Sequence, residues 1–147
     1  VNSRLDSIQA AILNIKLQHL DEYAAARQQV AAAYDKAFGV RPELVIPARS
    51  PKSTHVYHQY TLQAAGVDRN KLQEFLASKD VPAMIYYPVP IHLQKAYLDP
   101  RYKEGDFPVT EKLSHTVFSL PMHTEMDQEQ LDHIISSVLE FLDKSGK

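Results

Sequence analysis

The sequence lacks several features that mark whole classes of protein. None of its 147 residues is cysteine, which excludes a disulfide framework, a thiolate nucleophile and a thiolate metal site. Only four residues are glycine, at positions 39, 66, 105 and 146, and they are too far apart for a glycine-rich phosphate loop or a Rossmann turn. We therefore do not expect this chain to hold a nucleotide cofactor with a motif of its own.

An excess of one charge and a long apolar run are missing too. The 16 Lys and Arg residues nearly balance the 18 Asp and Glu residues, and the basic ones form no stripe, so we expect no nucleic-acid partner. No apolar run approaches the roughly 20 residues that span a bilayer, and no basic-then-apolar leader is present. These absences, together with the lack of cysteine, lead us to expect a cytoplasmic protein with no membrane partner.

The first part of the chain predicts one long helix over residues 5–38. Asp6 and Gln9 have the spacing of a capping box, apolar side chains recur at helical spacing from Ile8 onward, and Gly39 is a natural stop. A helix of roughly 30 residues is about 45 Å long, more than a domain of this size needs. We interpret it as a helix that bridges two domains or lines a subunit interface.

Shorter elements are predicted after Gly39. They are a loop over 41–54, a strand over 55–65, a helix over 68–78, a strand over 83–90, one or two helical turns over 92–99, a helix over 108–116, a strand over 118–123 and a helix over 127–143. This order predicts a small α/β or α+β lobe in which helices pack on a small sheet. Periodicity alone does not separate those two classes.

Histidine is abundant, with seven residues, yet no metal site is predicted. His55 and His58 are three apart on a predicted strand and would point to opposite faces, and no HExxH pattern is present. A GxSxG nucleophile elbow is absent as well. Metal-dependent and serine hydrolase chemistry are thus not expected.

Polar and aromatic side chains instead collect at the ends of predicted strands. They are His55, Tyr57, His58, Tyr60, Tyr86, Tyr87, His92, Gln94 and His123. In YYPVPIH two prolines stiffen a loop that presents Tyr87 and His92, which suits a rim that contacts a ligand. The alternative is that each tyrosine is a strand former and each histidine a solvated loop residue.

Four stretches, in order, carry a family resemblance that covers nearly the whole chain. They are NSRLDSIQAAIL, HVYHQYTL, IYYPVPIHLQKAY and FPVTEKLSHTVFSLPMHTEM. They resemble the C-terminal part of the DegT/DnrJ/EryC1/StrS aminotransferases, which use pyridoxal 5′-phosphate (PLP). The resemblance implies the C-terminal domain of a fold-type I PLP-dependent transferase. Residues 1–39 would be the helix bridging to an N-terminal PLP-binding lobe outside this chain, and residues 40–147 the small α/β lobe.

The resemblance also implies a function for the complete enzyme. It would be a homodimer that moves an amino group from an amino acid, typically glutamate, to a nucleotide-linked keto-sugar for polysaccharide, O-antigen or antibiotic sugar biosynthesis. The Schiff-base lysine of the family would lie upstream of Val1, which we therefore expect to be a cut end. None of the chain's lysines matches it, so the resemblance implies no catalytic residue, no tightly bound PLP and no activity for this chain alone.

Six residues match ligand-facing positions of the family's motifs: Asn2, Arg4, His55, Tyr57, His58 and His92. The match implies that Asn2 contacts the PLP phosphate of the other subunit. For Arg4 it implies a contact with a sugar or diphosphate oxygen or with an interface carboxylate, and a salt bridge with Asp6 is the alternative. The other four are expected near the nucleotide-sugar pocket.

Two other functions stay open. One is a non-catalytic binding or assembly module with the same fold, and the other is a sugar dehydratase of the same family in which histidine replaces the Schiff-base lysine. The chain does not identify the keto-sugar, its ring position or the nucleotide. Loss of a lobe would expose the apolar stripe of the first helix, so we expect this chain to self-associate or to swap that helix.

Overall fold

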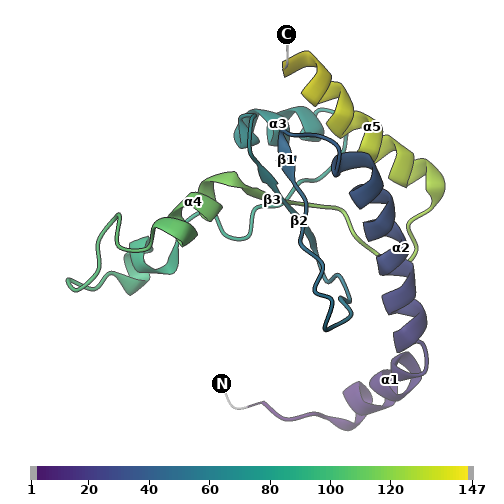
Figure 1. The fold of residues 1–147 in the computed structure, drawn as a ribbon. Helices are drawn as coiled ribbons and strands as arrows, with labels where there is room; N and C mark the ends of the chain where they lie inside the picture. Colours follow the sequence, from purple (N-terminus) through teal and green to yellow (C-terminus); the bar gives the residue numbers. More distant parts are fainter. Residues whose placement is uncertain (1–2, 146–147) are drawn as a thin grey trace.

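The fold, described from a computed structural model over residues 3–145, is a small sheet with helices packed on it (Figure 1). The helices are α1 (Ser7–Leu17), α2 (Leu20–Phe38), α3 (Arg69–Ala77), α4 (Pro108–Thr116) and α5 (Gln128–Ser145), with short 3-10 helices η1 (Ile91–Leu93) and η2 (Lys95–Tyr97). The strands are β1 (Leu44–Val45), β2 (Tyr60–Ala64) and β3 (Val117–Leu120). The helices predicted over 68–78, 108–116 and 127–143 are confirmed within one or two residues.

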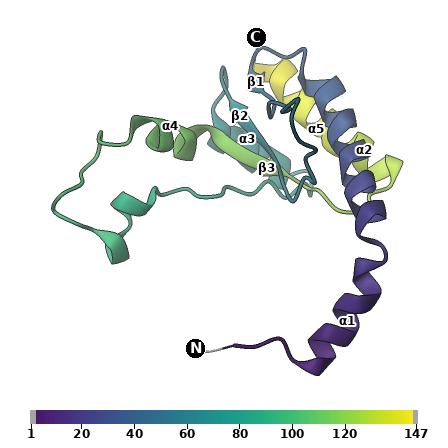
Figure 2. The same cartoon turned by 60° about the horizontal axis from the view of Figure 1, so that its bottom comes forward.

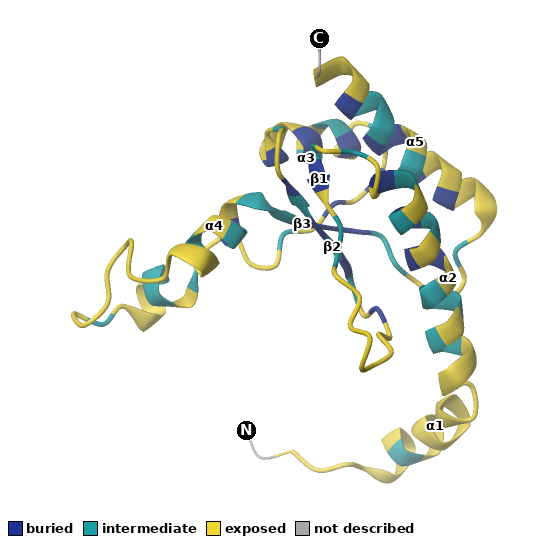
Figure 3. Ribbon diagram, in the orientation of Figure 1, coloured by how far each residue is buried: buried dark blue, intermediate teal, exposed yellow. Residues whose placement is uncertain are grey.

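The three strands form an antiparallel sheet in the order β1-β2-β3, in which Leu62 lies opposite Phe118 and Tyr60 opposite Leu120. Side chains of β2 alternate, because successive residues of a strand point to opposite faces. The buried face packs against the core residues of α2, α3 and α5, where the buried positions gather in Figure 3. The opposite face, with Thr61, borders the cavity described below.

Aromatic side chains of α2 and β2 lie at the centre of the core. The ring of Tyr34 is 5.7 Å from that of Phe38 and 4.9 Å from that of Tyr60, and all three residues are fully buried. The Tyr34 hydroxyl donates a hydrogen bond of 2.9 Å to the carbonyl oxygen of Pro121, which satisfies its buried polar atom. Burial raises the pKa of this hydroxyl well above its usual value of 10.0, so it stays a donor.

The single long helix predicted over 5–38 is wrong at one place, because α1 ends at Leu17 and α2 begins at Leu20. The amides of Gln18 and His19 donate to carbonyl oxygens three residues earlier, at 3.3 and 3.1 Å, instead of four. Neither proline nor glycine lies here, and nothing in the structure explains why the break falls at this point. The predicted capping box and the stop at Gly39 are both confirmed.

The predicted strands also need correction. The strand over 55–65 is shortened to Tyr60–Ala64, because the preceding residues form a loop in which Tyr57 has φ of 48°, outside the strand region. Residues 83–90 are not a strand: only Met84 pairs, with Ser119 of β3, and the prolines beyond it cannot donate to a ladder. The predicted loop over 41–54 contains β1, which forms one edge of the sheet.

Two parts of the fold extend away from the core. Residues 88–116, here called the arm, contain η1, η2 and α4 and project to one side of the sheet (Figures 1 and 2). On another side α1 leads away toward the N-terminus, and it contains no buried residue. Most residues of α1 and of the arm are exposed.

Candidate functional site

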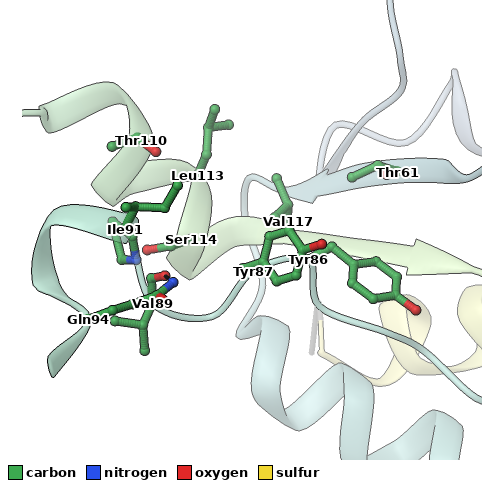
Figure 4. A pocket seen from close by; sticks show the side chains of 11 residues that line it. Thr61, Tyr86, Tyr87, Val89, Ile91, Gln94, Thr110, Leu113, Ser114 and Val117 are labelled. Atoms are coloured by element: carbon green, nitrogen blue, oxygen red, sulfur yellow. Dashed lines mark hydrogen bonds between the residues drawn. The ribbon is translucent and has the colours of Figure 1, made fainter. Parts of the chain in front are cut away.

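A cavity of about 300 Å³ lies where the arm meets the sheet (Figure 4). Its lining comes from the sheet, from the loop before the arm and from both sides of the arm: Thr61, Tyr86, Tyr87, Val89, Pro90, Ile91, Gln94, Thr110, Leu113, Ser114 and Val117. Tyr87 is 73% exposed and Tyr86 41%. The expectation that YYPVPIH presents Tyr87 at a rim is consistent with this placement.

The polar groups of the cavity are all neutral. Hydroxyls come from two tyrosines, two threonines and a serine, and Gln94 adds an amide; each hydroxyl can both donate and accept a hydrogen bond. One of these polar side chains is fixed by a hydrogen bond, because the Gln94 amide donates to the carbonyl oxygen of Val89 at 2.9 Å. Aromatic surface with neutral hydroxyls suits a ligand rich in hydroxyl groups rather than a simple ion.

His92 lies on η1 but does not line this cavity. Its side chain is only 8% exposed, its Nε2 is 3.0 Å from a carboxylate oxygen of Glu111, and its ring is 4.8 Å from that of Phe107. It borders a second cavity of about 520 Å³ on the arm, which Tyr97 and Tyr102 also line. Its predicted contact with substrate stays a prediction.

His55 and Tyr57 are brought together in the loop before β2. The backbone N–H of Tyr57 donates to Nδ1 of His55 at 2.8 Å, and the two rings are 4.3 Å apart. Gln28 of α2 donates its side-chain amide to the carbonyl oxygen of His55 at 3.0 Å. Tyr57 is 3% exposed, and both residues line a third cavity of about 310 Å³ with Arg49.

An acidic residue beneath this loop was not found from the sequence. The Asp35 carboxylate of α2 accepts hydrogen bonds of 2.7 Å from the Arg49 Nε and from the Tyr60 hydroxyl, and Arg49 lies 5.7 Å above the ring of Tyr57. Burial, and then the bond to Asp35, raise the pKa of Tyr60 well above its usual value of 10.0. This network fastens the loop to α2. Arg49 and Tyr60 are 14 and 25 residues from Asp35 in the chain, so the sequence gives no sign that they meet.

The remaining predicted residues lie elsewhere. His58 is exposed and borders a hollow of about 320 Å³ that it shares with Tyr86 and Met122. Arg4 is exposed before α1, where its guanidinium donates to the carbonyl oxygen of Ser3 at 3.1 Å. Asn2 lies outside the described residues. The predicted residues that the structure describes are thus spread over several surfaces, and among them only His55 and Tyr57 share a cavity.

Metal binding and membrane insertion receive no support from the residues that the structure describes. Among residues 3–145, no three His, Asp or Glu side chains are grouped to hold a metal ion. In the same part of the chain, no helix combines the length and the apolar character needed to cross a membrane. We take the cavity at the base of the arm, which neutral hydroxyl and amide groups line, as the candidate site.

Comparison with known proteins decides the family. The sequence profile of the DegT/DnrJ/EryC1/StrS aminotransferase family matches residues 1–139. The chain belongs to this family. The family consists of PLP-dependent aminotransferases, so the predicted recognition and fold class are confirmed.

Two relatives show how much of a longer protein this chain matches. It is 40% identical over 142 residues to the "Pleiotropic regulatory protein" of Geobacillus stearothermophilus, a match that covers 95% of this chain and 38% of the relative. It is 35% identical to the dTDP-3-amino-3,6-dideoxy-alpha-D-galactopyranose transaminase of Aneurinibacillus thermoaerophilus, covering 94% and 37%.

A solved structure of a relative matches the chain over a similar share of its length. DesV of S. venezuelae, in complex with a ketimine intermediate, superposes with a TM-score of 0.91 at 33% identity, covering 97% of this chain and 38% of that one. The chain therefore spans little more than a third of the length of its relatives in this family.

Proposed function

We propose that this chain is the C-terminal lobe of a nucleotide-sugar aminotransferase. The complete enzyme moves an amino group from an amino acid, typically glutamate, to a keto-sugar linked to a nucleotide. The observation that carries the proposal is the cavity of Tyr86 and Tyr87, whose neutral hydroxyl and amide groups match a sugar ring, in a chain of an aminotransferase family. The transaminase names of relatives such as the Aneurinibacillus protein support it.

PLP does not fit this chain as a complete site. The cofactor needs a lysine amine for its Schiff base, and no lysine lines any of the cavities described above. We propose that the cofactor is held mainly by the lobe outside this chain. When bound, PLP supplies the electron sink for amino transfer, and this chain's role is to bind and orient the sugar.

The predicted contact residues belong to this proposal. Asn2 would donate its amide N–H to the PLP phosphate of the partner subunit in a homodimer, and Arg4 would hold a sugar or diphosphate oxygen. His55, Tyr57, His58 and His92 are proposed contacts of the nucleotide-sugar pocket. The spread of these residues over separate surfaces of this chain is compatible with a pocket completed by other parts of the dimer.

A second candidate function is a non-catalytic regulatory or assembly module. The names of two relatives favour it: the pleiotropic regulatory protein named above, and the erythromycin biosynthesis sensory transduction protein EryC1 of Saccharopolyspora erythraea, 36% identical. The family dehydratase is the remaining alternative.

One assay separates these functions. The complete enzyme is incubated with ¹⁵N-glutamate and a panel of nucleotide-linked keto-sugars, and ¹⁵N in the sugar product is measured by mass spectrometry. We expect ¹⁵N transfer to one sugar. Loss of water without ¹⁵N transfer would indicate the dehydratase, and no reaction with any sugar would favour the regulatory module.

A second experiment, on this chain alone, tests whether the cofactor is held outside it. The 147-residue chain is titrated with PLP, and any Schiff base is trapped with borohydride and mapped. We expect no saturable adduct. A stoichiometric adduct on a single lysine would show that this chain holds the cofactor itself.

A further inference from the structure

One carboxylate ties three parts of the arm together. An oxygen of Glu111, in the first turn of α4, lies 3.0 Å from Nε2 of His92 on η1. The same carboxylate accepts the backbone N–H of Gly105 at 3.0 Å and that of Phe107 at 3.2 Å. Glu111 thus joins η1, the turn before α4 and α4 itself.

The environment of the pair favours a fixed geometry. The side chains of Glu111 and His92 are only 16% and 8% exposed, so water competes little for their hydrogen bond. Burial opposes the charge of Glu111, but the amide hydrogen bonds and the imidazole outweigh it and hold its pKa below the usual 4.5. A carboxylate acceptor at Nε2 requires the proton on that nitrogen, which sets the tautomer of His92.

The two elements that Glu111 joins are also two walls of the 300 Å³ cavity. Ile91 and Gln94 come from η1 and its end, and Thr110, Leu113 and Ser114 come from α4 (Figure 4). Glu111 is the neighbour of Thr110 in the chain, yet neither it nor His92 lines the cavity. The hydrogen bond between Glu111 and His92 therefore connects the two walls outside the cavity.

The turn that Glu111 caps depends on this carboxylate. Gly105 has φ of 93°, a region that glycine enters without strain, and its N–H points at Glu111. The N-cap residue of α4 is Phe107, and Glu111 accepts the backbone N–H of this residue, which fixes the chain where it enters the helix.

We propose that Glu111 is a positioning residue for the sugar cavity. Through His92 and the turn it fixes η1 against α4 and thereby the spacing of the cavity walls. The inference rests on the proposed function, because it assigns the cavity to the sugar. Its consequence is selective: the sugar half of the reaction depends on Glu111, and the amino-acid half does not.

The test uses the complete enzyme with Glu111→Gln. The substitution replaces one acceptor oxygen by an NH₂ donor, so at least one of the N–H groups that Glu111 binds loses its partner. An unpaired buried group of this kind is expected to weaken binding of the sugar roughly tenfold. We expect KM for the keto-sugar to rise about tenfold, with kcat within about twofold. The rate of the half-reaction with glutamate alone, followed by absorbance, is expected to stay within about twofold.

The controls separate loss of the Glu111 hydrogen bonds from a general loss of structure. Glu104→Gln makes the same change at an exposed position of the same turn and is expected to leave all constants unchanged. Glu111→Asp keeps the charge and is expected to recover part of the KM. The ring ¹⁵N shifts of labelled His92 report the tautomer, which we expect Glu111→Gln to disturb.

Each outcome decides something different. An unchanged KM in Glu111→Gln, with the His92 signals disturbed, overturns the positioning role alone. A fall in the glutamate half-reaction as large as the rise in KM shows a general loss of structure and overturns it too. Absence of amino transfer in the wild type overturns the proposed function first, before any variant is compared.

Discussion

The apolar stripe of α1 predicts self-association of this chain. No residue of α1 is buried, and Ile8, Ile12 and Ile15, which are spaced to share one helix face, are 75%, 51% and 65% exposed. A face with this much exposed apolar surface is a driving force for association. The change that tests it is the double substitution Ile8→Gln/Ile15→Gln, which keeps good helix formers in α1 and leaves its capping box intact.

The structure sets the expected magnitude. Complete burial of an isoleucine side chain is worth about 1.5–3 kcal/mol, and Ile8 and Ile15 expose roughly two thirds to three quarters of theirs. Covering each in an interface is therefore worth about 1–2 kcal/mol, and a symmetric dimer covers the two residues of both copies, which is worth about 4–8 kcal/mol. Loss of this contribution raises the dissociation constant by about three to six orders of magnitude.

Sedimentation equilibrium over a range of concentrations measures the effect. We expect the wild-type chain to form dimers or larger species and the double variant to sediment as a monomer. Val40→Gln is the control, since Val40 is 80% exposed but lies after α2, away from this face, and is expected to behave as wild type. A wild-type chain that stays monomeric at the highest concentration, or a double variant that associates as strongly as wild type, would refute the reasoning.

Two further predictions concern stability. Arg69 is buried and its guanidinium donates to the carbonyl oxygens of Val117 at 2.8 Å and Ser114 at 3.3 Å, so Arg69→Ala removes two hydrogen bonds from a charged donor, and we expect a loss of roughly 2–3 kcal/mol in urea unfolding. A loss under about 0.5 kcal/mol would contradict a structural role for that bond. Hydrogen bonds from Lys144 and Lys79 lower the pKa of Glu140 from 4.5 to about 2, so its contribution is complete above pH 4.5 and declines as the pH falls toward 2. The difference in unfolding temperature between wild type and Glu140→Gln should shrink over that range, and a difference independent of pH would argue against this ion pair.

Local patterns predicted most of the helical part of the fold. The apolar stripe of α5 repeats with the period of a helix, and the spacing of Asp6 and Gln9 predicted the capping box at the start of α1. Such signals act over a few residues, so they survive without knowledge of the rest of the chain. The strands were predicted less well, because β1 has only two residues and depends on pairing with Ala64.

The candidate site was predicted in part. The stiff, proline-rich loop with Tyr87 was recognised because its composition is unusual for a scaffold, and the structure places Tyr87 on the cavity. His92 was recognised by resemblance, but its pairing with Glu111 was not. The partners are 19 residues apart and meet only because η1 folds back on α4.

Composition, periodicity and motif order thus determined what this chain is on their own. They excluded thiol chemistry and phosphate loops and predicted a small helical and sheet lobe, since each depends on residue types or short spacings, and the resemblance of four motifs to a known family supplied the aminotransferase assignment. Tertiary structure alone decided the hydrogen bonds of Glu111 with His92 and the separation of His92 from the cavity. These depend on which distant segments meet, and burial strengthens a hydrogen bond only after that meeting has taken place.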